Sequence, residues 1–377
     1  MYKAYKFRIY PTQEQRVLIN KNLGCKRFVY NHFLDKNKNT KKLYHYNCIN
    51  QLNNKLKKEF LFLLEVDSLI LYNAIFSLSN NIDRYTNSGF GFPKFKSKHG
   101  KNSYTTIAVY GKYKDKEYCN IEVNMKNKTV KLPKLKLVKI RGYRKLDRIS
   151  GKIKNATISR EPNGKYYVSI LCEIPNVSPL TKPNTIVGID VGVKTLITLS
   201  DGISYNNNKY IEKYEKRIKK CQKDLSRKQN GSNNYYKCKQ KLARLYSKLA
   251  NARKYYTHKI TKTITEEYDI IACENLNTKD MIEQKVMAKK ITDATLTEII
   301  RQLEYKSKQK GKYFYKIDTY YPSSQTCSVC NHIDKKYKDV SIRTYECSVC
   351  NNIMDRALHA SINIMFEGLK LYMTTIV

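Results

Sequence analysis

Four cysteines near the end of the chain have the type and spacing of metal ligands. They are Cys327, Cys330, Cys347 and Cys350, two Cys-x-x-Cys pairs separated by sixteen residues. Thiolates in this pattern are typical of a closed tetrahedral zinc site, which stabilises a fold and leaves no coordination position open for catalysis. The sequence therefore predicts a structural zinc ribbon, with His332 as a substitute ligand or a chance pairing of cysteines as the alternatives.

An asparagine follows each cysteine pair, at Asn331 and Asn351. A zinc knuckle usually turns there through a left-handed backbone conformation, which asparagine tolerates best after glycine. Both residues therefore favour a zinc knuckle.

Of the eleven cysteines, the other seven are scattered singly. Because the first twenty residues contain no apolar signal segment, we expect free thiols in a reducing compartment rather than disulfides.

Two carboxylates stand at the ends of apolar, strand-like runs. Asp190 lies in Gly-Ile-Asp-Val-Gly at the end of such a run, and Glu274 directly follows the run at 268–273. If these runs are neighbouring strands of one sheet, their ends bring the carboxylates within several ångströms of each other. Hard oxygen ligands of this kind suit Mg²⁺. Taken singly, Asp190 also fits an ordinary turn, and Glu274 fits the start of a helix.

The first part of the chain combines a strand, a helical block and several short strands. Alternation of Tyr5, Phe7 and Ile9 with basic residues predicts a strand with one buried face. Thr12 and Gln15 predict a capping box that opens a helix, and helical periodicity continues to about residue 87. Strand-like runs follow at 104–110, 121–125, 156–160 and 166–174. Pro-Asn-Gly between the last two runs predicts a hairpin.

The second part of the chain has a different pattern. Apolar runs at 186–192, 195–199, 268–273 and 313–318 predict strands. Helical periodicity in the lysine-rich stretch at 209–262, broken by Asn-Gly-Ser, predicts a basic helical hairpin. Its exposed lysines are either a plain solvated surface or a groove for a polyanion.

The net charge indicates the kind of partner. The 377-residue chain carries 72 Lys plus Arg against 32 Asp plus Glu, a formal charge of +40. A compact chain with this charge repels itself unless a polyanion neutralises it, and nucleic acid is the expected polyanion. An anionic membrane surface is the alternative, but the longest apolar run, 60–64, is too short to span a bilayer. We therefore expect a cytoplasmic, nucleoid-associated protein.

These motifs occur in the order found in one protein family. Gly188-Ile-Asp-Val-Gly192, Ala272-Cys-Glu-Asn-Leu276, the two cysteine pairs and Asp355-Arg-Ala-Leu-His-Ala-Ser-Ile-Asn-Ile364 resemble the TnpB family, transposon-encoded relatives of type V CRISPR effectors. The opening Lys-Phe-Arg-Ile-Tyr-Pro-Thr, Gly24-Cys-Lys-Arg-Phe-Val-Tyr-Asn31 and Gly91-Phe-Pro-Lys-Phe-Lys96 extend the resemblance over nearly the whole chain.

The resemblance implies a multidomain α+β and α/β architecture. Residues 1–11 and 88–180 would form a wedge β domain, a β-barrel, with 12–87 as a helical recognition insertion. Residues 184–377 would form an RNase H-like RuvC domain, with the zinc ribbon inserted at 322–354. The implied partners are a guide RNA and a double-stranded target DNA. In guided systems the protein reads a short flanking motif, while base pairing reads the target sequence.

One position departs from the family pattern. The last family signature runs Asp-Arg-Asp-x-Asn, and its second Asp completes the metal-binding carboxylate set. Here that position is Ala357, and the Asn is replaced by His359. Cleavage with two metal ions needs carboxylates that hold the ions about 4 Å apart. Asp355 is a possible substitute, but two helical residues turn through roughly 200°. We therefore expect Asp355 to point away from the metal position and to cap the helix.

Together these residues predict a guided DNA-binding protein with a vestigial nuclease site. Asp190 and Glu274 would be the remaining catalytic residues, zinc would be structural, and little or no Mg²⁺ binding is expected at the RuvC-like site. Such a protein would repress transcription, or block another process, by occupying its target. The alternatives are an active Mg²⁺-dependent RNA-guided endonuclease that uses Asp355 or a displaced ligand, and an RNA-binding accessory protein of transposition.

Overall fold

The computed structural model describes residues 1–376 apart from 39, 114–115, 143–148, 277–291 and 340. The chain divides into two compact units, Met1–Pro175 and Asn176–Val377. Each unit has hydrophobic clusters of its own, so each is described by itself. Within the described residues, no helix combines the length and the apolar composition needed to cross a bilayer.

The first unit is built on a seven-stranded antiparallel sheet. Its order is β2-β8-β9-β1-β7-β6-β5. The strands are β1 (Tyr2–Tyr10), β2 (Ser103–Ile107), β5 (Glu122–Asn124), β6 (Thr129–Leu132), β7 (Lys136–Arg141), β8 (Lys152–Arg160) and β9 (Tyr166–Glu173), and a separate hairpin joins β3 (Tyr110–Tyr113) to β4 (Lys116–Cys119). The predicted closed barrel stays a prediction, because β2 and β5 are the two ends of the described order.

Local signals in this unit had the predicted effect. Tyr5, Phe7 and Ile9 are buried on one face of β1, which confirms the predicted strand. The β8–β9 hairpin contains the predicted Pro-Asn-Gly turn, in which Gly164 adopts a φ of +82°. Such left-handed backbone is accessible to glycine at little cost, which explains why this residue type occupies the turn.

Helices follow β1 and precede β2. They are α1 (Gln13–Lys36), α2 (His45–Gln51), η1 (Leu52–Leu56), α3 (Lys57–Glu59), η2 (Leu61–Leu64) and α4 (Ser68–Ser88). The predicted capping box is confirmed, because the Thr12 hydroxyl accepts a hydrogen bond from the Gln15 N–H while the Gln15 side chain accepts one from the Thr12 N–H. Buried apolar side chains of α1 and α4 share one hydrophobic cluster.

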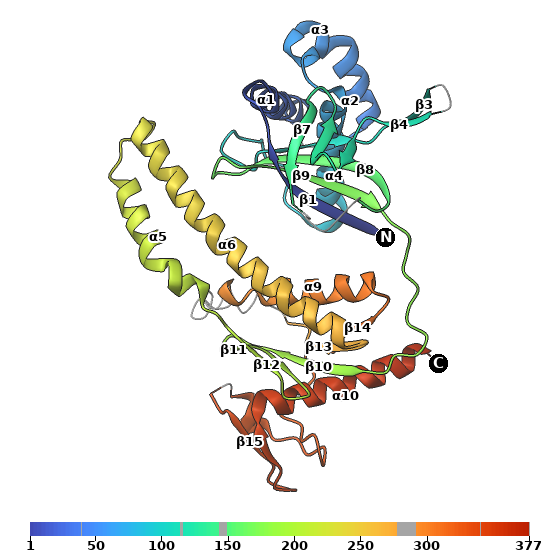
Figure 1. Ribbon diagram of the computed structural model, residues 1–377, viewed down its shortest axis with the longest axis vertical. Coiled ribbons are helices and arrows are strands. Elements are labelled where there is room, and N and C mark those ends of the chain that lie inside the picture. The colour runs from blue at the N-terminus through green and yellow to red at the C-terminus, as the bar shows by residue number, and fades with distance from the viewer. Residues whose placement is uncertain (39, 114–115, 143–148, 277–291, 340, 377) are drawn as a thin grey trace. The chain divides into compact units, whose positions relative to one another are not determined.

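The second unit contains a five-stranded mixed sheet. Its order is β12-β11-β10-β13-β14, formed by β10 (Ile186–Val191), β11 (Thr195–Leu199), β12 (Ser204–Asn206), β13 (Ile270–Cys273) and β14 (Tyr313–Lys316). Strand β13 is parallel to both β10 and β14, whereas β11 is antiparallel to β10 and β12. Helices α6 (Asn233–Glu267) and α9 (Leu296–Gln309) cover one face, and α10 (Arg356–Ile376) covers the other (Figure 1).

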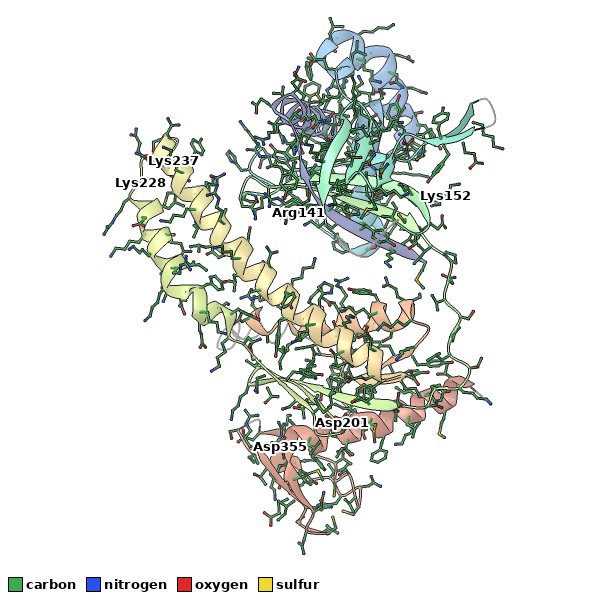
Figure 2. All side chains as sticks on the ribbon, in the orientation of Figure 1. Arg141, Lys152, Asp201, Lys228, Lys237 and Asp355 are labelled. Atoms are coloured by element: carbon green, nitrogen blue, oxygen red, sulfur yellow. The ribbon has the colours of Figure 1, made fainter. Side chains whose placement is uncertain are left out.

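The predicted basic hairpin consists of α5 (Tyr210–Ser226) and α6. The two helices pack through a small cluster with Ile218 and Leu245 in its core, while most of their lysines are exposed. The Ser232 hydroxyl caps α6 by accepting a hydrogen bond from the Tyr235 N–H at 3.1 Å. Lys228 and Lys237 lie at the tip of the hairpin (Figure 2).

Close packing between α10 and the sheet depends on two glycines. A Cβ on Gly188 would lie 2.0 Å from the Ser361 carbonyl oxygen and 2.4 Å from the Met365 nitrogen. A Cβ on Gly368 would lie 2.2 Å from the Cβ of Ala272. Any side chain at Gly188 or Gly368 would push α10 away from β10 and β13, so these glycines determine how near the helix comes to the strands.

Candidate functional site

The structure brings the two predicted carboxylates together. In the β10–β13 register, Gly188 is opposite Ala272 and Ile189 is opposite Cys273. Asp190 and Glu274 are the next residues along their strands, and neighbouring strands lie about 4.8 Å apart. Because side chains alternate between the faces of a sheet, both carboxylates belong to the face on which Gly188 and Ala272 contact α10.

Burial and mutual repulsion make this pair unusually basic. Burial, with the charge of Glu274 as the second cause, raises the pKa of Asp190 to about 8. Burial also raises the pKa of Glu274, while a hydrogen bond from the Ser323 hydroxyl to its Oε1 at 2.9 Å and the charge of Arg356 act to lower it. Such a pair is stabilised by a shared proton or by a cation.

Ala357 occupies the sheet-facing stripe of α10. It precedes Ser361 by four residues, and Met365 and Gly368 continue the same helical face. Since Ser361, Met365 and Gly368 contact the strands, Ala357 lies at the end of this stripe near the carboxylates. Its methyl group offers no ligand atom. The pair alone suits at most one hard cation and does not fit the three-carboxylate arrangement that holds two Mg²⁺ ions.

Asp355 caps α10, as predicted. Its Oδ1 accepts hydrogen bonds from the Ala357 N–H at 2.9 Å and the Leu358 N–H at 3.1 Å. The residue is exposed and lies at the start of the helix (Figure 2). Its charge contributes to the raised pKa of Asp190, so Asp355 is near enough to act electrostatically on the pair. Its Oδ1 is nevertheless already occupied by the two hydrogen bonds that cap the helix.

The four predicted zinc ligands form one cluster. Their sulfur atoms all lie within 4.8 Å of one another, and the Cys327–Cys350 and Cys330–Cys347 pairs are separated by 3.6 and 3.5 Å. Tetrahedral coordination with Zn–S bonds of about 2.3 Å places sulfurs about 3.8 Å apart, so the cluster fits Zn²⁺. In the described part of the chain, this metal-capable group contains no histidine, and the exposed His332 is not a member.

The knuckle backbone supports this arrangement. Asn331 and Asn351 have φ values of +61° and +54°, which confirms the predicted left-handed turns. Hydrogen bonds from the backbone N–H groups of Cys350 and Val349 lower the pKa of Cys347 to about 6. A depressed pKa favours the thiolate, which is the form that binds metal.

Helix α10 also anchors the cysteine-containing segment. The His359 Nε2 accepts a hydrogen bond from the Ser328 N–H at 3.0 Å, and its ring stacks on Tyr345 with 3.6 Å between centroids. Asn363 Nδ2 donates to the carbonyl oxygens of Ser323 and Thr326 at 2.7 and 2.6 Å. Burial lowers the pKa of His359 to about 4, so this histidine is neutral at pH 7. It therefore acts here as a hydrogen-bond acceptor and packing group.

Several residues of the site were not predicted from the sequence. Ser323 donates to Glu274, and its carbonyl oxygen also accepts from Asn363, so one serine ties the carboxylate to α10. Arg356 donates from its guanidinium to the Tyr337 carbonyl oxygen and the Ser324 hydroxyl. No periodicity or spacing marks Ser323, whereas Ser324 opens a Ser-x-Thr-Cys stretch before the first cysteine pair that belongs to the family resemblance. Arg356 and Asn363 belong to the quoted C-terminal motif, which was the available signal for them.

Comparison with known proteins gives matches along the whole chain. The IS605 OrfB profile, described as "Probable transposase", matches residues 169–285. A helix-turn-helix profile of the same family matches 1–43, and the Cas12f1-like TNB domain matches 297–364. The last match includes both cysteine pairs and the whole motif at 355–364.

Two relatives match over nearly their full lengths. A Streptomyces pristinaespiralis protein, provisionally named an RNA-guided DNA endonuclease, is 29% identical over 374 residues, which covers 97% of this chain and 89% of the relative. InsQ of Escherichia coli strain K12, with the same provisional name, is 29% identical over 387 residues and is covered to 92%.

A solved Cas12f1–sgRNA–target DNA complex covers 97% of the chain at 16% identity, with a TM-score of 0.37, which is too low to support an argument. The three profiles together match most of the chain, and with the two near-complete relatives they support the assignment of this protein to the TnpB family.

Proposed function

We propose that this protein binds DNA under the guidance of an RNA and occupies its target without cutting it. Its effect would be repression of transcription, or of another process that needs access to the target. The observation that carries the proposal is Ala357 on the sheet-facing stripe of α10, near Asp190 and Glu274. A methyl group there leaves the carboxylate set one ligand short of the arrangement that holds two metal ions.

Guided targeting is supported by the relatives and by the charge. The relatives from Streptomyces pristinaespiralis and Escherichia coli carry names that assign them RNA-guided DNA cleavage. The formal charge of +40 and the exposed lysines of the α5–α6 hairpin suit a polyanionic partner. The proposed partners are a guide RNA and a double-stranded target DNA, and binding to them would bring the protein to the nucleoid.

The domain roles belong to the same proposal. The sheet of 1–11 and 88–180 would be the wedge domain, and the helices of 12–87 its recognition insertion. Residues 184–377 would be the RuvC-like domain, and 322–354 its ribbon. Zinc would be held by the four cysteines as a structural ion that stabilises this segment.

An active endonuclease is the second candidate. The paired Asp190 and Glu274 favour it, because two neighbouring carboxylates suit a hard cation once a third ligand is supplied. Asp355 is the carboxylate available to supply it. Engagement of Asp355 Oδ1 by two backbone N–H groups argues against this role, since a ligand at the metal position would have to leave the helix cap.

The test starts with the RNA that copurifies with the protein. Sequencing identifies that RNA, and its guide end is then replaced with a chosen sequence. Binding of matched and mismatched duplexes is measured, and the matched complex is incubated with Mg²⁺. We expect matched DNA to be bound more tightly and to remain uncut. Asp190→Ala is the control, and it should leave binding unchanged.

Three outcomes would overturn the proposal. Guide-dependent cleavage that Asp190→Ala abolishes would establish the active endonuclease. Equal binding of matched and mismatched DNA in the presence of a defined RNA would remove guided targeting. Absence of any defined copurifying RNA would favour an accessory role in transposition.

A further inference from the structure

A half-buried lysine in the first unit lies among other lysines rather than beside an acid. Lys26, on α1, donates a hydrogen bond from its Nζ to the Ser103 carbonyl oxygen at 2.9 Å. Burial, together with the charges of Lys96 and Lys101, lowers the pKa of Lys26 to about 8. Mutual repulsion between three ammonium groups disfavours this arrangement in the free protein.

The segment that carries Lys96 and Lys101 is held in place by side chains of α1. It runs from residue 94 to 102 without helix or strand and then enters β2. Asn31 clamps it at Lys96, donating from Nδ2 to the carbonyl oxygen at 3.0 Å and accepting the N–H at 2.8 Å. Arg27 donates to the Asn102 side chain at 3.3 Å. The repelling lysines are therefore brought together by specific contacts.

Among the described residues, no carboxylate forms an ion pair with Lys26, Lys96 or Lys101. Ion pairs in the described part of the unit engage other lysines, namely Lys6, Lys21, Lys38, Lys131 and Lys154. Lys96 places its Nζ 4.7 Å from the centre of the Tyr30 ring, and both Lys96 and Lys101 are exposed. An ammonium has three donors, and the Ser103 carbonyl uses one donor of Lys26. Donors and positive charge therefore remain for an external anion.

We propose that Lys26, Lys96 and Lys101 form a binding site for the phosphates of a nucleic-acid backbone. A phosphodiester supplies the negative charge and the acceptor oxygens that the three ammonium groups lack, and phosphate contacts of this kind position a nucleic acid without reading its sequence. The inference deepens the proposed function, because it names a place where the RNA or DNA of that complex is held. It does not depend on guidance or on cleavage.

The test measures how salt weakens binding of unguided nucleic acids. Fluorescein-labelled probes are a 20-bp DNA duplex, a 20-nucleotide DNA strand and the matching RNA strand. Each phosphate contact contributes about 0.9 to the slope of log K against log salt for a duplex and about 0.7 for a single strand. Lys96→Gln with Lys101→Gln should therefore reduce the slope by roughly 1.8 or 1.4 for the probe that occupies the site.

A matched control variant shows whether the change in slope comes from this particular group of lysines or from the loss of any two positive charges. Lys131→Gln with Lys154→Gln removes the same charge from exposed lysines of the same unit that pair with Glu122 and Glu173. We expect this control to change the slope by much less. Equal changes in both double variants, or no change in the first, would overturn the proposal.

Further arms identify the ligand and test Lys26 itself. Lys26→Met should remove about one more contact, and if it fails to fold, the double variant still decides the question. The probe with the largest slope change shows whether RNA or DNA occupies the site. If inorganic phosphate protects Lys96 and Lys101 from acetylation but no nucleic acid does, the site binds a free anion and the proposal is wrong. The probes pair with no guide, so failure of guided targeting leaves this result unaffected.

Discussion

Restoring a carboxylate at Ala357 should make the second unit sensitive to Mg²⁺. Burial and the charge of Glu274 raise the pKa of Asp190 to about 8, so a further negative charge beside the pair is unfavourable. At an effective dielectric constant of 20, two unit charges about 6 Å apart repel each other by roughly 3 kcal/mol, which sets the scale of this cost. Because an aspartate at this position would lie in the first turn of α10, its interaction with the helix dipole would offset about 0.5–1 kcal/mol of this repulsion. Ala357→Asp should therefore destabilise the metal-free unit by about 2 kcal/mol.

Mg²⁺ should reverse this loss. For a unit of this size, about 2 kcal/mol lowers Tm by roughly 4–8 °C. Mg²⁺ at 100 times its Kd contributes about 2.7 kcal/mol, enough to offset the repulsion. Calorimetry with and without MgCl₂ measures both effects. The buffer contains no chelator, because a chelator would also remove metal from the cysteine cluster.

Matched variants show whether the carboxylate itself is responsible. Ala357→Asn adds similar bulk without charge and should show no Mg²⁺-dependent shift. Ala357→Asp combined with Asp190→Asn should lose the shift seen in the single variant. Equal Mg²⁺ shifts in the unmodified protein and in Ala357→Asp would refute the reasoning, because the third ligand would then be unnecessary. With a bound guide, Ala357→Asp should also recover some cleavage of matched DNA.

Three further predictions concern other parts of the molecule. Cys347→Ser should release zinc and unfold the 322–354 segment, and unchanged zinc content with an unchanged melting profile would eliminate the ribbon. Asp355→Ala should cost about 1 kcal/mol of unfolding free energy through loss of the α10 cap, whereas Asp355→Asn should cost little; equal losses in urea unfolding would contradict a capping role. The pKa of Lys26 is lowered to about 8, so between pH 8 and about 10.5 the unfolded chain binds the proton that the folded chain has released. The free energy of unfolding of the unmodified protein, minus that of Lys26→Met, should therefore rise with pH in that window. Urea unfolding at several pH values measures this difference, and a difference that falls with pH would refute the burial of the Lys26 charge.

Local features were predictable because their causes are local. The Thr12–Gln15 capping box, the Gly164 turn and the left-handed Asn331 and Asn351 each depend on contacts or backbone preferences within a few residues. The Asp355 cap follows the same logic, since its partners are two and three residues away. The four cysteines form a further case, because their paired spacing already indicated a shared centre.

Non-local features required the tertiary structure. The sequence by itself determined which carboxylates, thiols and charges the chain carries, and it indicated several strands and helices, although β6 and β7 were not predicted. It did not determine that β10 pairs with β13, that Ser323 holds Glu274, or that Lys26 lies among other lysines. These contacts join segments that are tens of residues apart, so no local propensity marks them. Packing decided them: because Gly188 and Gly368 have no side chains, α10 approaches the sheet closely, and the helical stripe that includes Ala357 faces β10 and β13.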